Sequence, residues 1–269
     1  MSQAHFLVWS DLHIEHSPFA PPALSELPHA PTALLVAGDT DKYGRHVRHY
    51  ADWAQRYGCP VIAIDGNHEP FFRDIVESEQ EADSEALRCR MEGLGVHILR
   101  GQAHSVGGCR IIGATLWADF SLHGTPEASQ ELAAREMNDH KVIRMHDGLF
   151  TPDRSLARHR QERAAILGHL AQPYAGPTIV MTHHLPRLEL GMAIFADSPR
   201  SPAFASDMRA DLAPLAFDAW IYGHTHGSDH GRVWRDEQGR PFLFNARGDT
   251  DPNPDFDPTF MWTVTQTGG

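Results

Sequence analysis

Aspartate, asparagine and histidine side chains stand directly after five short apolar runs in this chain. The runs occupy residues 6–9, 33–37, 61–64, 178–181 and 219–222. The side chains that follow them are Asp11, His13, Asp39, Asn67, His68, His183, His224 and His226. Carboxylate, carboxamide and imidazole groups together suit divalent transition metals such as manganese, iron or zinc, and the set contains no thiolate. The pattern therefore predicts a metal site.

The spacing within two of these groups indicates that the side chains converge. Asp11 and His13 lie two residues apart, as do His224 and His226. In an extended chain this spacing puts both side chains on one face. So many candidate ligands exceed what one ion needs, and two ions that share one carboxylate fit better. The alternative is ordinary buried histidines, because the chain has 19 histidines and some must be coincidental. Recurrence after five separate apolar runs favours the metal site.

Short strands must position these groups. Residues 61–64 follow Gly58-Cys59-Pro60 and predict a buried strand that ends at the turn Asp65-Gly66. In α/β proteins, ligand sites lie beyond the carboxyl ends of the strands. Five such ends would gather the candidate ligands in one crevice.

The remaining pattern predicts helices over residues 44–57, 77–91, 127–138 and 152–171, with Thr151 capping the last and Pro152 in its first turn. Short strands are expected at 97–99, 110–112 and 114–117, with a hairpin around Gly107-Gly108. A second hairpin joins 232–235 to 241–245, and 260–265 is the last strand. The proline-rich stretch 17–31 predicts a surface loop over the site, and His16 and His29 are expected in solvent. We expect one domain, residues 1–269.

Composition limits the classes of function. The formal net charge of −12 argues against a nucleic-acid partner, since phosphate backbones require a basic face. It leaves room for a phosphorylated small molecule, because metal ions would supply local positive charge. The chain has no apolar run long enough for a membrane span and no recognisable signal peptide. Only Cys59, Cys89 and Cys109 are present, which predicts reduced thiols and a cytoplasmic protein.

The ordered motifs resemble those of the calcineurin-like metallophosphoesterases. They are Asp11-Leu12-His13, Gly38-Asp39, Gly66-Asn67-His68-Glu69, a histidine after a later strand, and Gly223-His224-Thr225-His226. The resemblance spans residues 11–226 and implies a four-layer α/β/β/α sandwich with two mixed β-sheets packed face to face.

The resemblance also implies a ligand set for two divalent ions. One ion would bind Asp11, His13, Asp39 and His226, and the other Asp39, Asn67, His183 and His224, with Asp39 bridging. His68 would face the leaving-group oxygen and not bind metal. His183 is preferred as the ligand because it comes first after its strand, and His184 is the fallback.

One motif departs from the protein-phosphatase branch of the family. That branch has Gly-Asp-x-x-Asp-Arg-Gly, whereas Lys42 stands here at the second aspartate and Tyr43 at the arginine. Neither replacement reproduces the bidentate arginine clamp on phosphate, which argues against protein serine/threonine phosphatase activity. The segment 198–204 resembles stretches of bacterial members, and no role follows for it. Asp119, Asp139 and Asp249 follow no motif and are left out of the expected site.

We therefore expect a metal-dependent hydrolase of phosphate mono- or diesters of small molecules. A metal-activated water would be the nucleophile, and His68 would be the general acid or transition-state stabiliser. The alternatives are a nuclease, a protein phosphatase and a non-catalytic scaffold. A nuclease would need a basic tract, which the sequence lacks, and a scaffold would be expected to have lost ligands, whereas every position is filled.

Overall fold

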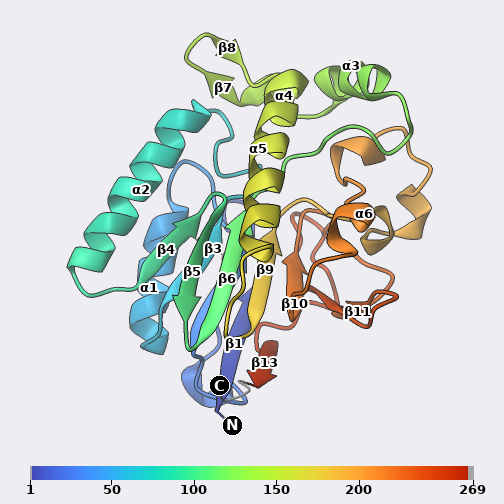
Figure 1. The fold of residues 1–269 in the computed structure, drawn as a ribbon. Helices are drawn as coiled ribbons and strands as arrows, with labels where there is room; N and C mark the ends of the chain where they lie inside the picture. Colours follow the sequence, from blue (N-terminus) through green and yellow to red (C-terminus); the bar gives the residue numbers. More distant parts are fainter. Residues whose placement is uncertain (1, 266–269) are drawn as a thin grey trace.

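Two β-sheets packed face to face form the centre of the computed structural model, which describes residues 2–265 (Figure 1). The first sheet has the order β13-β1-β2-β3-β4. Its strands are β1 (Gln3–Trp9), β2 (Ala33–Ala37), β3 (Val61–Ile64), β4 (Val96–Leu99) and β13 (Met261–Thr265). The first four run parallel, and β13 is antiparallel to β1 at the edge.

The second sheet has the order β11-β12-β10-β9-β6-β5. Its strands are β5 (Gln102–Val106), β6 (Cys109–Ala114), β9 (Thr178–Thr182), β10 (Ala219–Tyr222), β11 (Val233–Arg235) and β12 (Pro241–Phe244). The four central strands are parallel, and the antiparallel strands β5 and β11 form the edges. Both sheets are therefore mixed, as expected.

Apolar residues on both faces of the strands account for the four layers. In β1, Phe6 and Val8 face the core between the two sheets, whereas Leu7 and Trp9 face the helices outside. The alternation follows from the two-residue period of a strand. Because both faces are covered, the central strands are apolar throughout, as is usual for parallel sheets.

Helices complete the sandwich (Figure 1). The first sheet is covered by α1 (His46–Tyr57) and α2 (Ile75–Met91), and the second by α5 (Pro152–Leu170) and the short α6 (Arg209–Leu212). Further elements are α3 (Pro126–Glu136), α4 (Asp139–Val142), β7 (Arg144–Met145) and β8 (Gly148–Leu149). The described residues also form the 3-10 turns η1 (Leu24–Glu26), η2 (Leu188–Leu190), η3 (Ala193–Phe195) and η4 (Ser201–Ala203). Among the described residues, no helix is long and apolar enough to cross a membrane.

The structure confirms the fold class and the five strands that precede the candidate ligands. It also confirms the four predicted helices, to within two residues at each end, and the second hairpin. The hairpin at Gly107-Gly108 is also confirmed, but it joins β5 to β6. The prediction of a strand at 114–117 is wrong. Beyond β6 the Thr115 hydroxyl donates to the carbonyl of Asp65, and the carbonyl of Thr115 accepts from His183 and His184, which draws this segment out of the sheet.

Three local expectations also need correction. Thr151 stands at the cap position of α5, but its side chain makes no capping hydrogen bond. The 17–31 segment is irregular apart from η1 and mostly exposed, as expected for a surface loop, but around Pro22 it lies against α1, where the Pro22 carbonyl accepts hydrogen bonds from Arg56 and Tyr57. His16 is not simply solvated, since its Nε2 lies 3.2 Å from Lys42 Nζ.

Candidate metal centre

The candidate ligands come together at the carboxyl ends of the parallel strands, in two overlapping clusters. The first cluster contains Asp11, His13, Asp39 and His226, and the second contains Asp39, His183 and His224. Within each cluster the candidate ligand atoms all lie within 4.8 Å of one another. Asp39 belongs to both clusters, so its carboxylate stands between them.

In the first cluster, two imidazole rings face each other through their Nε2 atoms. His13 Nε2 lies 2.9 Å from His226 Nε2. Two N–H groups cannot point at each other at this distance, so at least one nitrogen presents a lone pair. Carboxylate oxygens approach the same point, since Asp39 Oδ2 lies 3.7 Å from His13 Nε2 and Asp11 Oδ1 lies 3.4 Å from His226 Nε2.

The second cluster is completed by a carboxamide oxygen. His183 Nε2 lies 3.2 Å from Asp39 Oδ2 and 3.0 Å from Asn67 Oδ1. Asn67 Oδ1 also lies 3.1 Å from His224 Nδ1. Asn67 therefore faces the second cluster, together with Asp39, His183 and His224.

The backbone turns sharply at most of these positions. Asp11, His13, Asp39, His224 and His226 all have φ between 42° and 71°, in the left-handed region. For residues other than glycine this conformation costs on the order of 1–2 kcal/mol each and is found at functional sites. The strained turns direct the side chains into the crevice as each strand ends.

Glycines beside the ligands let the loops approach one another. Gly38 has φ of +88°, and a Cβ there would lie 2.6 Å from the backbone nitrogen of Gly66 and 2.8 Å from His183 Nδ1. A Cβ on Gly223 would overlap the Asp11 carboxylate. A larger residue at either position would push the strand ends apart.

Hydrogen bonds behind the ligands fix their orientation. His183 donates through Nδ1 to the carbonyl of Ala37, at 2.9 Å, so Nε2 is the ring nitrogen that faces the cluster and that would bind an ion after losing its proton. Asn67 donates through Nδ2 to Asp139 Oδ1, at 2.9 Å, so its carbonyl oxygen faces the cluster. Asp139 is buried in α4, and the expected site omitted it because no motif marks it.

Glu69 holds two ligand loops together. Its buried carboxylate accepts backbone N–H groups from Thr40 at 2.7 Å, Gly66 at 2.7 Å and Asp39 at 3.1 Å. These donors belong to the loops after β2 and β3. The glutamate of the Asn-His-Glu sequence thus has a positioning role that the motif alone does not reveal.

His68 lies next to the first cluster and outside it. Its ring lies 4.5 Å from the ring of His13 and stacks on Phe71 at 4.2 Å between centroids. Its Nδ1 lies 3.1 Å from Glu15 Oε1, and its backbone N–H donates to Asp39 at 2.8 Å. His68 also takes part in a further group of side chains that could hold an ion, with His13, Glu15 and His16.

Glu15 is a second residue that sequence reasoning missed. Its Oε1 lies 3.3 Å from His13 Nδ1 and 3.4 Å from Lys42 Nζ. Burial acts to raise the pKa of Glu15, but hydrogen bonds from His13 and His68 outweigh burial and hold the pKa far below its usual range. The ionised carboxylate therefore orients both imidazoles.

His183 and His184 have different surroundings. Burial acts to lower the pKa of His183, but the neighbouring Asp39 carboxylate outweighs it and raises the pKa to about 10. Burial, reinforced by the neighbouring His183, lowers the pKa of His184 to about 3, so that ring is neutral. His184 packs between Trp117 and His224, and its Nδ1 has no hydrogen-bond partner within residues 2–265. His184 lies in neither cluster.

The neighbouring histidines keep the buried Asp39 carboxylate ionised. Burial acts to raise its pKa, but His183 and His68 outweigh burial and hold the pKa well below its usual value. The donor set of carboxylates, imidazoles and one carboxamide fits divalent manganese, iron or zinc. The fold and this crevice define the class: an α/β/β/α sandwich with metal-ligating side chains at the carboxyl ends of its parallel strands.

Comparison with known proteins identifies the family. Residues 4–228 match the sequence profile of the family described as Calcineurin-like phosphoesterase, so the chain belongs to it and is a metallophosphoesterase. No curated protein matches the chain significantly.

Two solved structures share the fold. A phosphopantetheinyl hydrolase from Mycobacterium tuberculosis is 20% identical with a TM-score of 0.64, and the alignment covers 92% of this chain and 90% of that one. A dimetal phosphatase from Danio rerio is 12% identical with a TM-score of 0.50, covering 94% and 89%.

Proposed function

We propose that this metallophosphoesterase hydrolyses phosphate esters of small organic molecules at a centre of two divalent ions that share Asp39. The observation that carries the proposal is the place of the Asp39 carboxylate in both donor clusters. One buried carboxylate between two sets of imidazoles suits a bridging ligand.

The proposed ligands follow the two clusters. Asp11, His13, Asp39 and His226 would hold one ion, and Asp39, Asn67, His183 and His224 the other. His183 is preferred to His184 because its Nε2 lies 3.2 Å from Asp39 and 3.0 Å from Asn67. Manganese, iron and zinc all suit these donors.

When bound, the ions supply Lewis-acid stabilisation of phosphoryl oxygens and lower the pKa of water at the site. The residues of the chain position the other groups. Glu15 Oε1 lies 3.1 Å from His68 Nδ1, so Nε2 is the ring nitrogen that would face a bound substrate. From there His68 would donate a proton to the leaving oxygen or stabilise the phosphoryl oxygens.

A small organic substrate fits the charge of the chain better than a nucleic acid does. The formal charge is −12, and a nuclease would need a basic face for the backbone. The Mycobacterium tuberculosis neighbour is named a phosphopantetheinyl hydrolase, and a phosphopantetheinyl group is likewise an organic phosphate ester. We further propose that residues 1–269 form one domain and that the protein is cytoplasmic, since its three cysteines are buried and form no disulfide among the described residues.

The test is a panel of phosphate mono- and diesters, including cyclic nucleotides, assayed with manganese beside plasmid and single-stranded DNA. We expect turnover of small esters, two equivalents of metal in the wild type, and loss of most metal and activity in Asp39→Asn. Two full equivalents in Asp39→Asn would refute the bridge. Faster cleavage of DNA would identify a nuclease, and no metal-dependent turnover would support a scaffold.

A further inference from the structure

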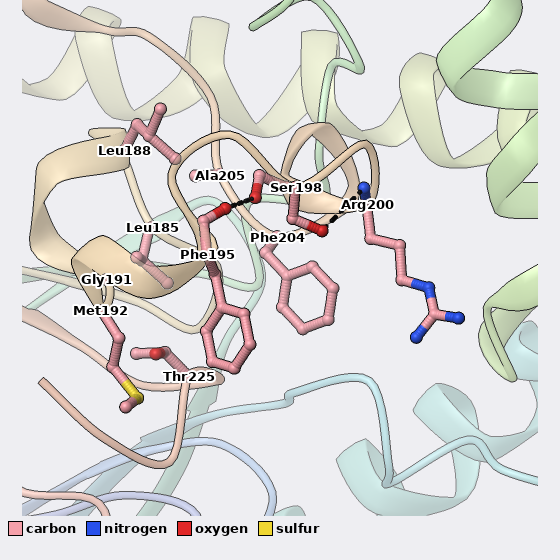
Figure 2. Close-up of a pocket in the computed structure, with 11 residues that line it drawn as sticks. Leu185, Leu188, Gly191, Met192, Phe195, Ser198, Arg200, Phe204, Ala205 and Thr225 are labelled. Atoms are coloured by element: carbon pink, nitrogen blue, oxygen red, sulfur yellow. Dashed lines mark hydrogen bonds between the residues drawn. The ribbon is translucent and has the colours of Figure 1, made fainter.

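A pocket of about 330 Å³ opens within the segment that joins β9 to β10 (Figure 2). Its apolar lining comes from Leu185, Leu188, Met192, Phe195, Phe204 and Ala205. The lining includes part of the 198–204 segment, for which the sequence indicated no role. The proposed hydrolysis uses none of these apolar side chains.

The pocket adjoins the candidate metal centre. Thr225 lines it, and this residue stands between His224 and His226 in the chain. The Phe204 ring lies 4.7 Å from the His224 ring between centroids. A group held in the pocket would therefore lie next to the ligand loop, where the substrate phosphate is expected.

The polar groups of the lining already have partners. Thr225 Oγ1 donates to the carbonyl of Gly227 at 2.8 Å, and Ser201 Oγ donates to the carbonyl of Phe195. The Arg200 guanidinium donates to Glu136, and Figure 2 shows it extending away from the two phenylalanine rings. The lining thus favours an uncharged, apolar occupant.

Hydrogen bonds hold the walls of the pocket in place. The backbone N–H of Leu185 donates to Phe204 at 3.1 Å, and the N–H of Ala193 donates to Asp229 at 2.6 Å. Pre-formed apolar pockets of this kind bind ligands without a large ordering cost. A cavity of about 150 Å³ is enough for benzene, so this pocket has room for a single or fused ring.

We propose that this pocket binds an aromatic or similarly bulky apolar group esterified to the substrate phosphate. The inference rests on the proposed hydrolysis and narrows its substrate class to phosphate esters that carry such a group. Simple alkyl phosphates would leave the pocket unused. Burial of one ring there would increase affinity by roughly ten- to a hundredfold.

Binding without turnover tests the pocket directly. Calorimetry on the manganese-loaded protein would compare phenylphosphonate with methylphosphonate, and we expect phenylphosphonate to bind at least about tenfold more tightly. Phe195→Ala removes one wall at a half-exposed position and should reduce this ratio severalfold. Ile194→Ala is the matched control, because Ile194 is 77% exposed and does not line the pocket.

A second test compares the hydrolysis of two diesters that share the p-nitrophenolate leaving group. Phenyl p-nitrophenyl phosphate should be hydrolysed with a higher kcat/KM than methyl p-nitrophenyl phosphate, and Phe195→Ala should narrow the difference. Equal binding of the two phosphonates, or no binding of either, would overturn the proposal. If neither diester nor any ester of the wider panel is hydrolysed, the proposed function fails, while the comparison of phosphonate binding still tests the pocket. If Phe195→Ala dissociates a dimer and leaves the phosphonate ratio unchanged, the pocket is an interface between copies, which would also overturn the proposal.

Discussion

Replacing Asp139 by alanine should weaken metal binding although Asp139 is not a proposed ligand. In the structure its Oδ1 accepts a 2.9 Å hydrogen bond from Asn67 Nδ2, which turns the Asn67 carbonyl oxygen toward His183 and His224. Without this acceptor, the carboxamide can rotate and present its NH₂ group to the site. The buried Asn67 donor would also be left unpaired, at a cost of about 1–3 kcal/mol.

The expected loss of metal affinity follows from the position of Asp139 behind the proposed ligand Asn67. Removing a hydrogen-bond partner that orients a metal ligand typically lowers metal affinity or activity by about 10–100-fold. This corresponds to roughly 1.4–2.7 kcal/mol. Asp139→Asn can still offer a carbonyl oxygen to Asn67 and should recover most of the affinity.

Titration of the metal-free protein with manganese, followed by calorimetry, measures this effect. Asp119→Ala is a matched control, because the Asp119 carboxylate bonds locally to Ser121 and lies in neither donor cluster. If Asp139→Ala lowers only the Tm and binds manganese like the wild type, the positioning role is refuted. The same conclusion follows if Asp139→Asn is as impaired as Asp139→Ala.

His183→Ala should remove much of the bound metal and most of the turnover, whereas His184→Ala should keep the metal stoichiometry. If elemental analysis gives the reverse result, the metal ligand is His184 and not His183. His68→Ala should retain both metals. Its kcat/KM should fall by up to about 10²–10⁴-fold on alkyl esters and by less on p-nitrophenyl esters, whose leaving group needs no proton. Parallel plots of log kcat/KM against leaving-group pKa for wild type and variant would exclude proton donation by His68. Burial raises the pKa of Glu162 to about 7, from a usual value of 4.5. The contribution of this group to the free energy of unfolding is therefore full below about pH 4.5 and is lost as the pH rises through 7. The loss amounts to roughly 3 kcal/mol. Glu162→Gln should flatten this part of the pH profile of the unfolding free energy in urea, and an unchanged profile would show that Glu162 does not titrate there.

The strands and the order of their ligand groups could be predicted from the sequence because both signals are local. Each apolar run is short, rich in residues that favour strands and followed at once by polar side chains. Parallel strands end at the same edge of a sheet, so the ligand groups after strands of one sheet could be expected to meet without knowledge of the loops. The packing of the two sheets then brings the groups after β1, β2 and β3 together with those after β9 and β10. The family motifs then distinguished Asp39, Asn67 and His68 from ordinary loop residues.

Only the tertiary structure decided which residues support the ligands and what lies beside them. Asp139 reaches Asn67 from 72 positions away in the chain, and the Phe204 ring packs on His224 from another segment. Glu15 meets His68 across 53 positions. These contacts depend on how the loops beyond the strands fold over the crevice, which has no periodic signature in the sequence. The path of Thr115 away from its sheet has the same origin, since a hydrogen bond to the Asp65 carbonyl, 50 positions away, outweighs the local strand propensity.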